Sequence, residues 1–116
     1  MNRRQPLPVK FYRTQAGREP VREWLLSLRR EDKKAIGEDI KTVQFGWPLG
    51  MPLVEKLERG IWEVRTDLEQ RIARVLFTIY GELIVLLHGF IKKTQKTPPQ
   101  DLALARRRLR ALREAL

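Results

Sequence analysis

The first third of the chain carries one short strand pattern and two helical patterns. Residues 8–14 (PVKFYRT) alternate, with Val9 and Phe11 on one face, and so predict a strand. A helix is predicted from Pro20, because apolar residues then recur at i, i+3, i+4 and i+7: Val21, Trp24, Leu25 and Leu28. A second helix is predicted over residues 31–44, ended by Gly46 and Pro48.

Three strand patterns follow a segment rich in proline and glycine. Residues 47–60 (WPLGMPLVEKLERG) are predicted to form a loop. The next run, from residue 61, alternates: Trp62 and Val64 point one way and Ile61, Glu63 and Arg65 the other. The runs 71–80 and 82–91 are apolar on both faces, which predicts strands covered on both sides by neighbouring layers.

The last element is predicted to be a helix that begins at Thr97. Thr97 is followed by Pro98 and, three residues on, by Gln100, which is the pattern of a capping box with proline at the first helical position. Its apolar stripe consists of Leu102, Ala105, Leu109, Leu112 and Leu116.

These elements predict one α+β domain spanning residues 1–116, in the order β-α-α-β-β-β-α. We expect a small, mostly antiparallel, four-stranded sheet. Its helices are expected on one side, two from the first half of the chain and one at the C-terminus.

Arg74 and His88 interrupt the two apolar strands. Burying an unpaired charge is very costly, so Arg74 must either form an ion pair, for instance with Glu63, or border a groove. A lone histidine among apolar residues, such as His88, is more often a satisfied core residue than a functional one, and both interpretations stay open.

The hairpin turn before residue 83 decides whether these two side chains can meet. A two-residue turn, Gly81–Glu82, places His88 opposite Val75, on the other face from Arg74. A three-residue turn places His88 opposite Arg74. The sequence leaves both registers open.

Charge changes the picture more than any other property of composition. The chain has 24 Lys and Arg against 14 Asp and Glu, a formal net charge of +10. From Lys92 to Leu116 there are eight basic residues and two acidic ones. A field of this sign attracts polyanions, so a nucleic-acid partner is expected.

Several kinds of chemistry are excluded by residue counts. Without cysteine and with one histidine, the chain cannot supply an ordinary zinc site, and no phosphate-binding or dinucleotide-binding glycine motif is present. We therefore expect neither metal nor cofactor. The absence of cysteine suits a reducing compartment and no apolar run approaches a membrane span, so a cytoplasmic location without membrane association is expected.

Three segments together resemble the HigB-like, phage-derived branch of the RelE/ParE toxin superfamily: LVEKLERGIWEVRTDL, RIARVLFTI and IVLLHGFIKKTQKTPPQDLALARRR. The resemblance covers nearly the whole chain, and its most specific part is LLHGFIKKTQKTP. The superfamily comprises toxins of type II toxin–antitoxin modules. The resemblance implies that the protein is a ribosome-dependent, metal-independent mRNA endoribonuclease. In the reaction of such an enzyme, the RNA 2′-hydroxyl attacks the adjacent phosphate.

The resemblance also implies which residues do this work. The candidate catalytic residues are Arg65, Arg74, Lys92, Lys56 and His88. The candidate RNA-binding residues are Lys93, Lys96, Phe90 and Arg106. No tyrosine or second histidine stands near the end of the strand that carries His88, so the general base is open between a lysine, His88 and Glu63.

The implied partners are mRNA in the ribosomal A site and a HigA-like helix-turn-helix antitoxin, with the free toxin monomeric and the complex hetero-oligomeric. Two other functions stay open. One is a ParE-like inhibitor of DNA gyrase, and the other is a basic nucleic-acid-binding module without catalytic activity.

Overall fold

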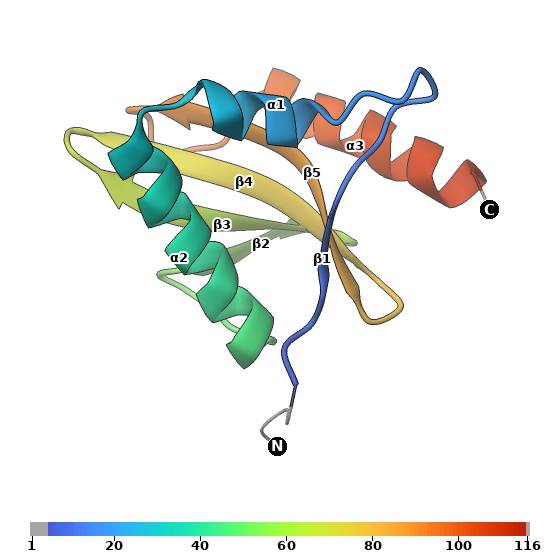
Figure 1. Cartoon of the computed structure of the whole chain (residues 1–116), viewed down its shortest axis with the longest axis horizontal. Helices are drawn as coiled ribbons and strands as arrows, with labels where there is room; N and C mark the ends of the chain where they lie inside the picture. Colours follow the sequence, from blue (N-terminus) through green and yellow to red (C-terminus); the bar gives the residue numbers. More distant parts are fainter. Residues whose placement is uncertain (1–4, 116) are drawn as a thin grey trace.

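The computed structural model describes residues 5–115, which form a five-stranded mixed sheet with helices on both faces (Figure 1). The strand order is β1-β5-β4-β3-β2, with β1 parallel to β5 and all other pairs antiparallel. The elements are β1 (Val9–Phe11), α1 (Pro20–Ser27), α2 (Arg30–Gly46), β2 (Val54–Glu58), β3 (Ile61–Leu68), β4 (Arg71–Tyr80), β5 (Leu83–Lys92) and α3 (Pro99–Glu114). The α+β class is confirmed. Leu116, the last residue of the predicted apolar stripe, lies outside the described residues.

The expectation of four strands was wrong, because the predicted loop 47–60 contains β2. Val54 pairs with Val64 of β3 and is buried in the core, while the loop ends before it. The proline and glycine residues of this segment are all outside the strand, and the strand forms because its tertiary neighbour β3 supplies the pairing. Sequence reasoning gave too much weight to the composition of the whole segment.

The expectation that all helices lie on one side was also wrong. The first two helices pack on one face of the sheet, where Ile36, Ile40 and Val43 meet strand residues such as Phe77. Helix α3 covers the opposite face, where Ala105 and Leu109 join a second cluster. Two cores explain why β4 and β5 are apolar on both faces, as the sequence predicted.

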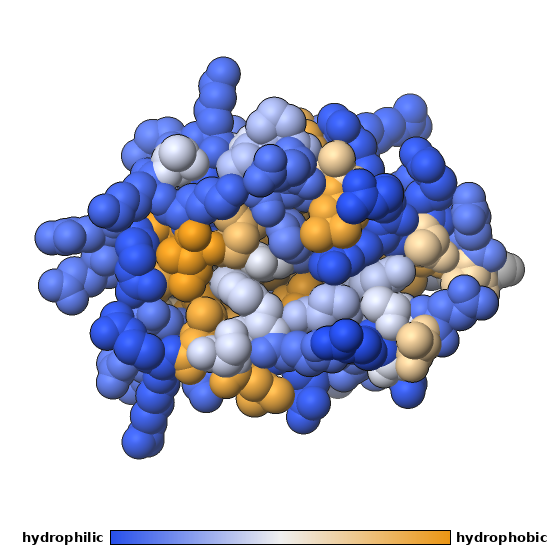
Figure 2. Space-filling model, turned by 90° about the horizontal axis from the view of Figure 1, so that it is seen from above, coloured by the Kyte–Doolittle hydropathy of each residue, from blue (hydrophilic) through white to orange (hydrophobic). Residues whose placement is uncertain are grey.

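Hydrophilic side chains dominate the face of the molecule that is seen from above (Figure 2). Figure 2 shows them projecting around nearly the whole rim of one face, with hydrophobic surface confined to areas between them. No helix within residues 5–115 is both long enough and apolar enough to cross a membrane.

Gly89 is placed where α1 crosses β5, and it offers a test of this packing. A Cβ atom at this position would lie 2.3 Å from a ring carbon of Trp24, so the backbone or the indole must shift. We expect Gly89→Ala to lower the free energy of unfolding by about 1–3 kcal/mol, as overpacking does.

Urea denaturation measures this effect, and Gly37→Ala provides the matched control. A Cβ on Gly37, in α2, meets no atom within 4 Å. Alanine should therefore stabilise the protein there by about 0.5–1 kcal/mol, because glycine is disfavoured within helices. Equal changes in both variants would contradict the close approach of α1 to β5.

Candidate functional site

Three neighbouring strands bring a group of polar and aromatic side chains together on the face that α3 covers. Arg74 of β4 lies directly opposite Arg65 of β3 and Phe90 of β5. The group consists of Glu63, Arg65, Arg74, His88, Phe90 and Lys92. Sequence reasoning named all six, although it placed Phe90 and Glu63 among open alternatives.

A β-bulge puts His88 on this face. The turn is the two-residue one, since Tyr80 pairs with Leu83, and this register alone would place His88 on the other face. However, the ladder shifts by one residue at Leu87, so that Phe77 pairs with Leu86 and Leu76 with His88. Neither predicted register therefore describes the whole hairpin. The two-residue turn is present, but the bulge changes the pairing partner of His88. Bulges commonly re-aim side chains beside functional sites.

Arg108 of α3 satisfies the backbone at the bulge. Its Nη1 donates a hydrogen bond of 2.7 Å to the carbonyl oxygen of Leu87. A residue inserted at a bulge leaves the regular ladder, and a buried carbonyl without a partner costs free energy. Arg108 thus stabilises the backbone geometry that directs His88 toward α3.

His88 meets an acidic residue that sequence reasoning did not single out. The distance from His88 Nε2 to Asp101 Oδ1 is 2.7 Å, and Lys92 Nζ donates to Asp101 Oδ2 over 3.3 Å. Asp101 lies in the first turn of α3 and is buried. The sequence counted it only as one acid within a basic tail; its place in the first turn of a predicted helix was the available signal.

The pKa of His88 is lowered from its ordinary value, mainly because burial disfavours the charged ring, although Asp101 acts in the opposite direction. Neutral His88 therefore predominates at pH 7. Since a carboxylate only accepts, the proton of the neutral ring is on Nε2 and Nδ1 carries the lone pair.

This shift predicts how stability depends on pH. Because the pKa of His88 is lower in the folded state than in the unfolded state, the unfolded state binds more protons below about pH 6.5. We expect His88 to make the protein less stable as the pH falls from about 6.5. Urea midpoints measured from about pH 7.5 to about pH 5 should decline less in His88→Gln than in the wild type, and parallel declines would contradict it.

Arg74 is fully buried, and its donors are directed at the β5–α3 loop. Nη1 donates to the carbonyl of Lys96 over 2.8 Å, and Nη2 donates to the carbonyl of Thr94. Nε lies 3.8 Å from Oε1 of Glu63, an ion pair without a hydrogen bond. Of the two alternatives that the sequence left open, the structure has the ion pair. A direct contact with RNA phosphate is not available to Arg74 in this geometry.

Arg65 is held by the same loop and by two acids. Its Nη2 donates to the backbone carbonyl and the side-chain oxygen of Gln95, both over 3.1 Å. Its guanidinium also lies 3.5 Å from Glu55 and 3.8 Å from Glu63. Two arginines directly opposite each other repel, and the carboxylates of Glu55 and Glu63 offset this repulsion.

Glu63 lies beneath the loop and is closed to solvent. Thr97 donates its hydroxyl hydrogen to Glu63 Oε2, and the predicted capping box is absent, since no side-chain hydrogen bond caps the helix. Helix α3 accordingly begins at Pro99, after a Pro98 cap without a side-chain hydrogen bond. Burial raises the pKa of Glu63, against the hydrogen bond from Thr97 and the charges of Arg74 and Arg65. With 0% of its surface exposed, Glu63 cannot reach a substrate as a general base.

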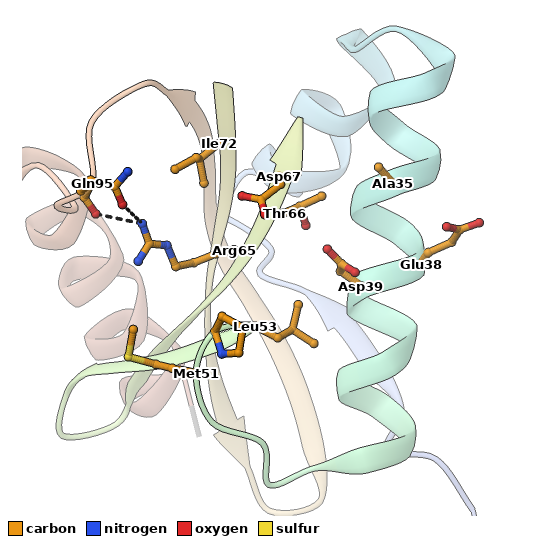
Figure 3. Close-up of a pocket in the computed structure, with 11 residues that line it drawn as sticks. Ala35, Glu38, Asp39, Met51, Leu53, Arg65, Thr66, Asp67, Ile72 and Gln95 are labelled. Carbon is orange, nitrogen blue, oxygen red and sulfur yellow. Dashed lines mark hydrogen bonds between the residues drawn. The ribbon is translucent and has the colours of Figure 1, made fainter. Parts of the chain in front are cut away.

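A pocket of about 570 Å³, lined in part by Arg65, opens between α2 and the β5–α3 loop (Figure 3). Carboxylates line it from two elements, with Glu38 and Asp39 on α2 and Asp67 on β3. Acids of this number repel phosphate groups, so the pocket is unsuited to RNA.

The other candidates are spread over different surfaces. Lys93 and Lys96 are exposed on the loop, and Lys92 is partly exposed beside Asp101. Phe90 is only 7% exposed, which fits the core interpretation and not a base-stacking platform; its ring stacks on His88 with centroids 5.4 Å apart.

Two candidates lie away from His88. Lys56 pairs with Trp62, on the opposite face of the sheet, and its Nζ lies 5.7 Å from the Trp62 ring. Arg106 is on α3, bound to Glu58 of β2. The structure therefore unites His88 and Lys92 with Arg65 and Arg74, and separates Lys56 and Arg106 from them.

Metal binding has no support in the described part of the chain. Within residues 5–115 no group of three His, Cys, Asp or Glu side chains could hold a metal ion. The site is instead a histidine–carboxylate pair beside Lys92, on the face of the sheet that carries a buried network of arginines and acids.

Comparison with known proteins identifies a family for this chain. Residues 23–110 match the family described as "Phage derived protein Gp49-like (DUF891)". Among curated proteins no match was found. Because the match covers most of the chain, including every strand from β2 to β5, the protein belongs to the Gp49-like family, a toxin-like family of toxin–antitoxin systems.

Proposed function

We propose that this protein is the toxin of a type II toxin–antitoxin module and cleaves mRNA on the ribosome, as the HigB-like branch of the RelE superfamily does. The observation that carries the proposal is the 2.7 Å hydrogen bond between His88 and Asp101, placed beside Lys92, the last residue of the strand that leads into the β5–α3 loop with its exposed lysines. A base held by an acid, beside cations, is the equipment that RNA transesterification needs.

The reaction is assigned to side chains as follows. His88 accepts the proton of the 2′-hydroxyl, and Asp101 holds the ring and stabilises the imidazolium that forms. The 2′-oxygen then bonds to phosphorus while the bond from phosphorus to the 5′-oxygen breaks. Lys92 donates a proton to that leaving oxygen. The products are a 2′,3′-cyclic phosphate and a 5′-hydroxyl.

The exposed cations stabilise the charge that develops on the phosphate. Lys93 and Lys96 carry positive charge on the loop, and no carboxylate within residues 5–115 forms a salt bridge with either of them. Arg65 and Arg74 have the separate task of holding that loop, since their charges are already paired with Glu55 and Glu63. In this proposal the arginines position the loop and the lysines bind RNA.

Cleavage in a translating extract tests the proposal. Wild-type protein is added to a cell-free translation reaction, and the 5′ ends and 3′ termini of a reporter mRNA are mapped. We expect cuts that appear only when ribosomes are translating and that leave cyclic phosphate. Intact mRNA together with gyrase-linked DNA breaks would overturn the proposal in favour of gyrase inhibition.

An antitoxin partner in general follows from the family, and a helix-turn-helix antitoxin of the HigA kind is part of the proposal. It is expected to suppress cleavage by covering the loop with Lys93 and Lys96. Sequencing the frame beside this gene and co-purifying its product with the toxin would check this expectation.

A further inference from the structure

A second cationic surface lies between the β2–β3 turn and the C-terminal half of α3. It is a groove of about 400 Å³ with arginines on both walls. Arg59 comes from the turn, and Arg106, Arg110 and Arg113 come from the helix. The three helical arginines recur at i, i+4 and i+7, so they lie along one stripe of α3. We call this surface the distal arginine groove.

Two of its arginines are held against the turn. Arg106 makes three hydrogen bonds of 2.6–3.0 Å to the carboxylate of Glu58. The guanidinium of Arg113 lies against Gly60, where a Cβ would come within 3.0 Å of Nη2. Gly60 has a φ of +85°, so glycine suits both the turn and this close approach. The hydrogen bonds to Glu58 hold the guanidinium of Arg106 in place before any ligand binds, and that of Arg113 lies close to the turn.

The charges of the groove are only partly compensated. It contains four arginines and two glutamates, Glu58 and Glu114. Within residues 5–115 no salt bridge is formed by Arg59 or Arg110, both of which are exposed. Like charges at i and i+4 on a helix repel each other, as Arg106 and Arg110 do here. A bound polyanion would relieve this repulsion.

The chemistry of the groove favours RNA over an acidic protein segment. Guanidinium groups bind phosphate through two parallel hydrogen bonds. The apolar residues that line the groove, Ile61 and Leu109, are 0% and 5% exposed. Protein interfaces usually offer apolar anchors at their centre, and this groove does not.

We propose that the distal arginine groove binds the phosphate backbone of RNA and anchors the toxin at a place separate from the cleavage site. This proposal rests on the proposed function, whose active site it supplements. Arg113 is twelve residues beyond Asp101 on α3, about 18 Å along the helix axis at about 1.5 Å per residue. One RNA segment must therefore extend along α3, or a second segment, such as ribosomal RNA, must occupy the groove.

The test compares two double variants with the same change in net charge. Arg59→Gln/Arg110→Gln removes two exposed arginines from the groove. Arg22→Gln/Arg30→Gln, the control, removes two exposed arginines from α1 and α2. Binding is measured at about 50–200 mM salt, to a short single-stranded RNA with 2′-deoxy nucleotides that prevent cleavage, and to vacant ribosomes.

We expect the groove variant to bind more weakly and with less dependence on salt. The slope of log K against log salt should become shallower by about 0.7 for each phosphate of a single strand that the variant no longer neutralises. The control should keep the wild-type slope. A change confined to ribosomes identifies ribosomal RNA as the ligand, and a change confined to the oligonucleotide identifies mRNA.

Equal slopes for the groove variant and the control on both ligands would overturn the proposal, and so would a groove variant that is impaired only in antitoxin binding. Because these measurements involve no cleavage, their outcome is independent of the active site. A wild-type protein that binds RNA through the groove but cuts no mRNA would refute the proposed function alone.

Discussion

Replacing Arg74 with alanine is expected to lower the free energy of unfolding by about 3–5 kcal/mol, because it leaves the buried carboxylate of Glu63 without one of its two arginine partners. Glu63 lies 3.8 Å from the Arg74 guanidinium, and both side chains are closed to solvent. In the same variant the carbonyl of Thr94 loses the donor from Arg74, and the carbonyl of Lys96 keeps only the hydroxyl of Thr94 as a donor. The ion pair and the loop are therefore weakened together.

Urea denaturation measures the loss, and Arg18→Ala is the control. Arg18 forms its ion pair with Glu23 on the surface, where both side chains are largely exposed. The denaturation midpoint of that variant should remain close to that of the wild type, since solvent screens the pair. If Arg74→Ala unfolded at the same urea concentration as Arg18→Ala, the buried network would not have the importance that we assign to it.

The rate of proteolysis within the β5–α3 loop distinguishes a local release of this loop from a loss of global stability. Lys93 and Lys96 lie within the loop and are exposed sites for trypsin. Under conditions where both proteins are folded, we expect trypsin to cut Arg74→Ala faster at these lysines, because local opening no longer breaks the bonds to Arg74. Cleavage at unchanged rates would mean that Arg65 and Thr97 suffice to hold the loop.

If the protein cleaves mRNA as proposed, removing the proposed general base, His88, has the largest expected effect on activity. We expect His88→Gln to lower the cleavage rate by about 10²–10⁴-fold, the usual contribution of general acid–base catalysis. Asp101→Asn should also reduce it, since the amide does not stabilise the imidazolium as a carboxylate does. The readout is the rate of mRNA cleavage in a translating extract.

The pH profile distinguishes a catalytic histidine from a structural one. Because burial lowers the pKa of His88, wild-type activity should rise with pH and reach a plateau below or near about pH 6.5. His88→Gln should lose this rise while remaining soluble and folded by circular dichroism.

Lysine variants provide the comparison for this second prediction. Lys41→Gln removes an exposed charge on α2, away from the site, and should cleave as the wild type does. Lys56→Gln should also retain most activity, because Lys56 lies on the opposite face of the sheet. A larger loss in Lys56→Gln than in His88→Gln would contradict the assignment of the base.

Much of the fold could be predicted because local patterns and tertiary structure agree. The apolar stripes of α1 and α2, the alternation in β3 and the two-sided burial of β4 and β5 all appear where periodicity placed them. The pairing of Arg74 with Glu63 was one of two expected solutions, since burial of a charge requires a partner.

Other features could not be predicted because they depend on distant parts of the chain. Strand β2 is short and mostly polar, and its formation depends on β3. The side of the sheet that α3 covers depends on where the loop after β5 leads. The Thr97 hydroxyl was expected to accept a hydrogen bond from a backbone N–H of its own helix, but it donates to Glu63, far away in the sequence, and the helix has no side-chain cap.

The sequence by itself determined the helices, four of the five strands, the cationic C-terminal segment and the residue types available for chemistry, because these depend on period, composition and charge. Only the tertiary structure decided which of those residues meet. One bulge at Leu87, stabilised by Arg108, turns His88 from the first core toward Asp101. Because Arg74 is buried, its guanidinium donates to backbone carbonyls of the β5–α3 loop, while the side chains of Lys93 and Lys96 in that loop stay exposed. A one-residue shift in register reverses the side of every following side chain in a strand, and such a shift is set by interactions that local sequence does not contain.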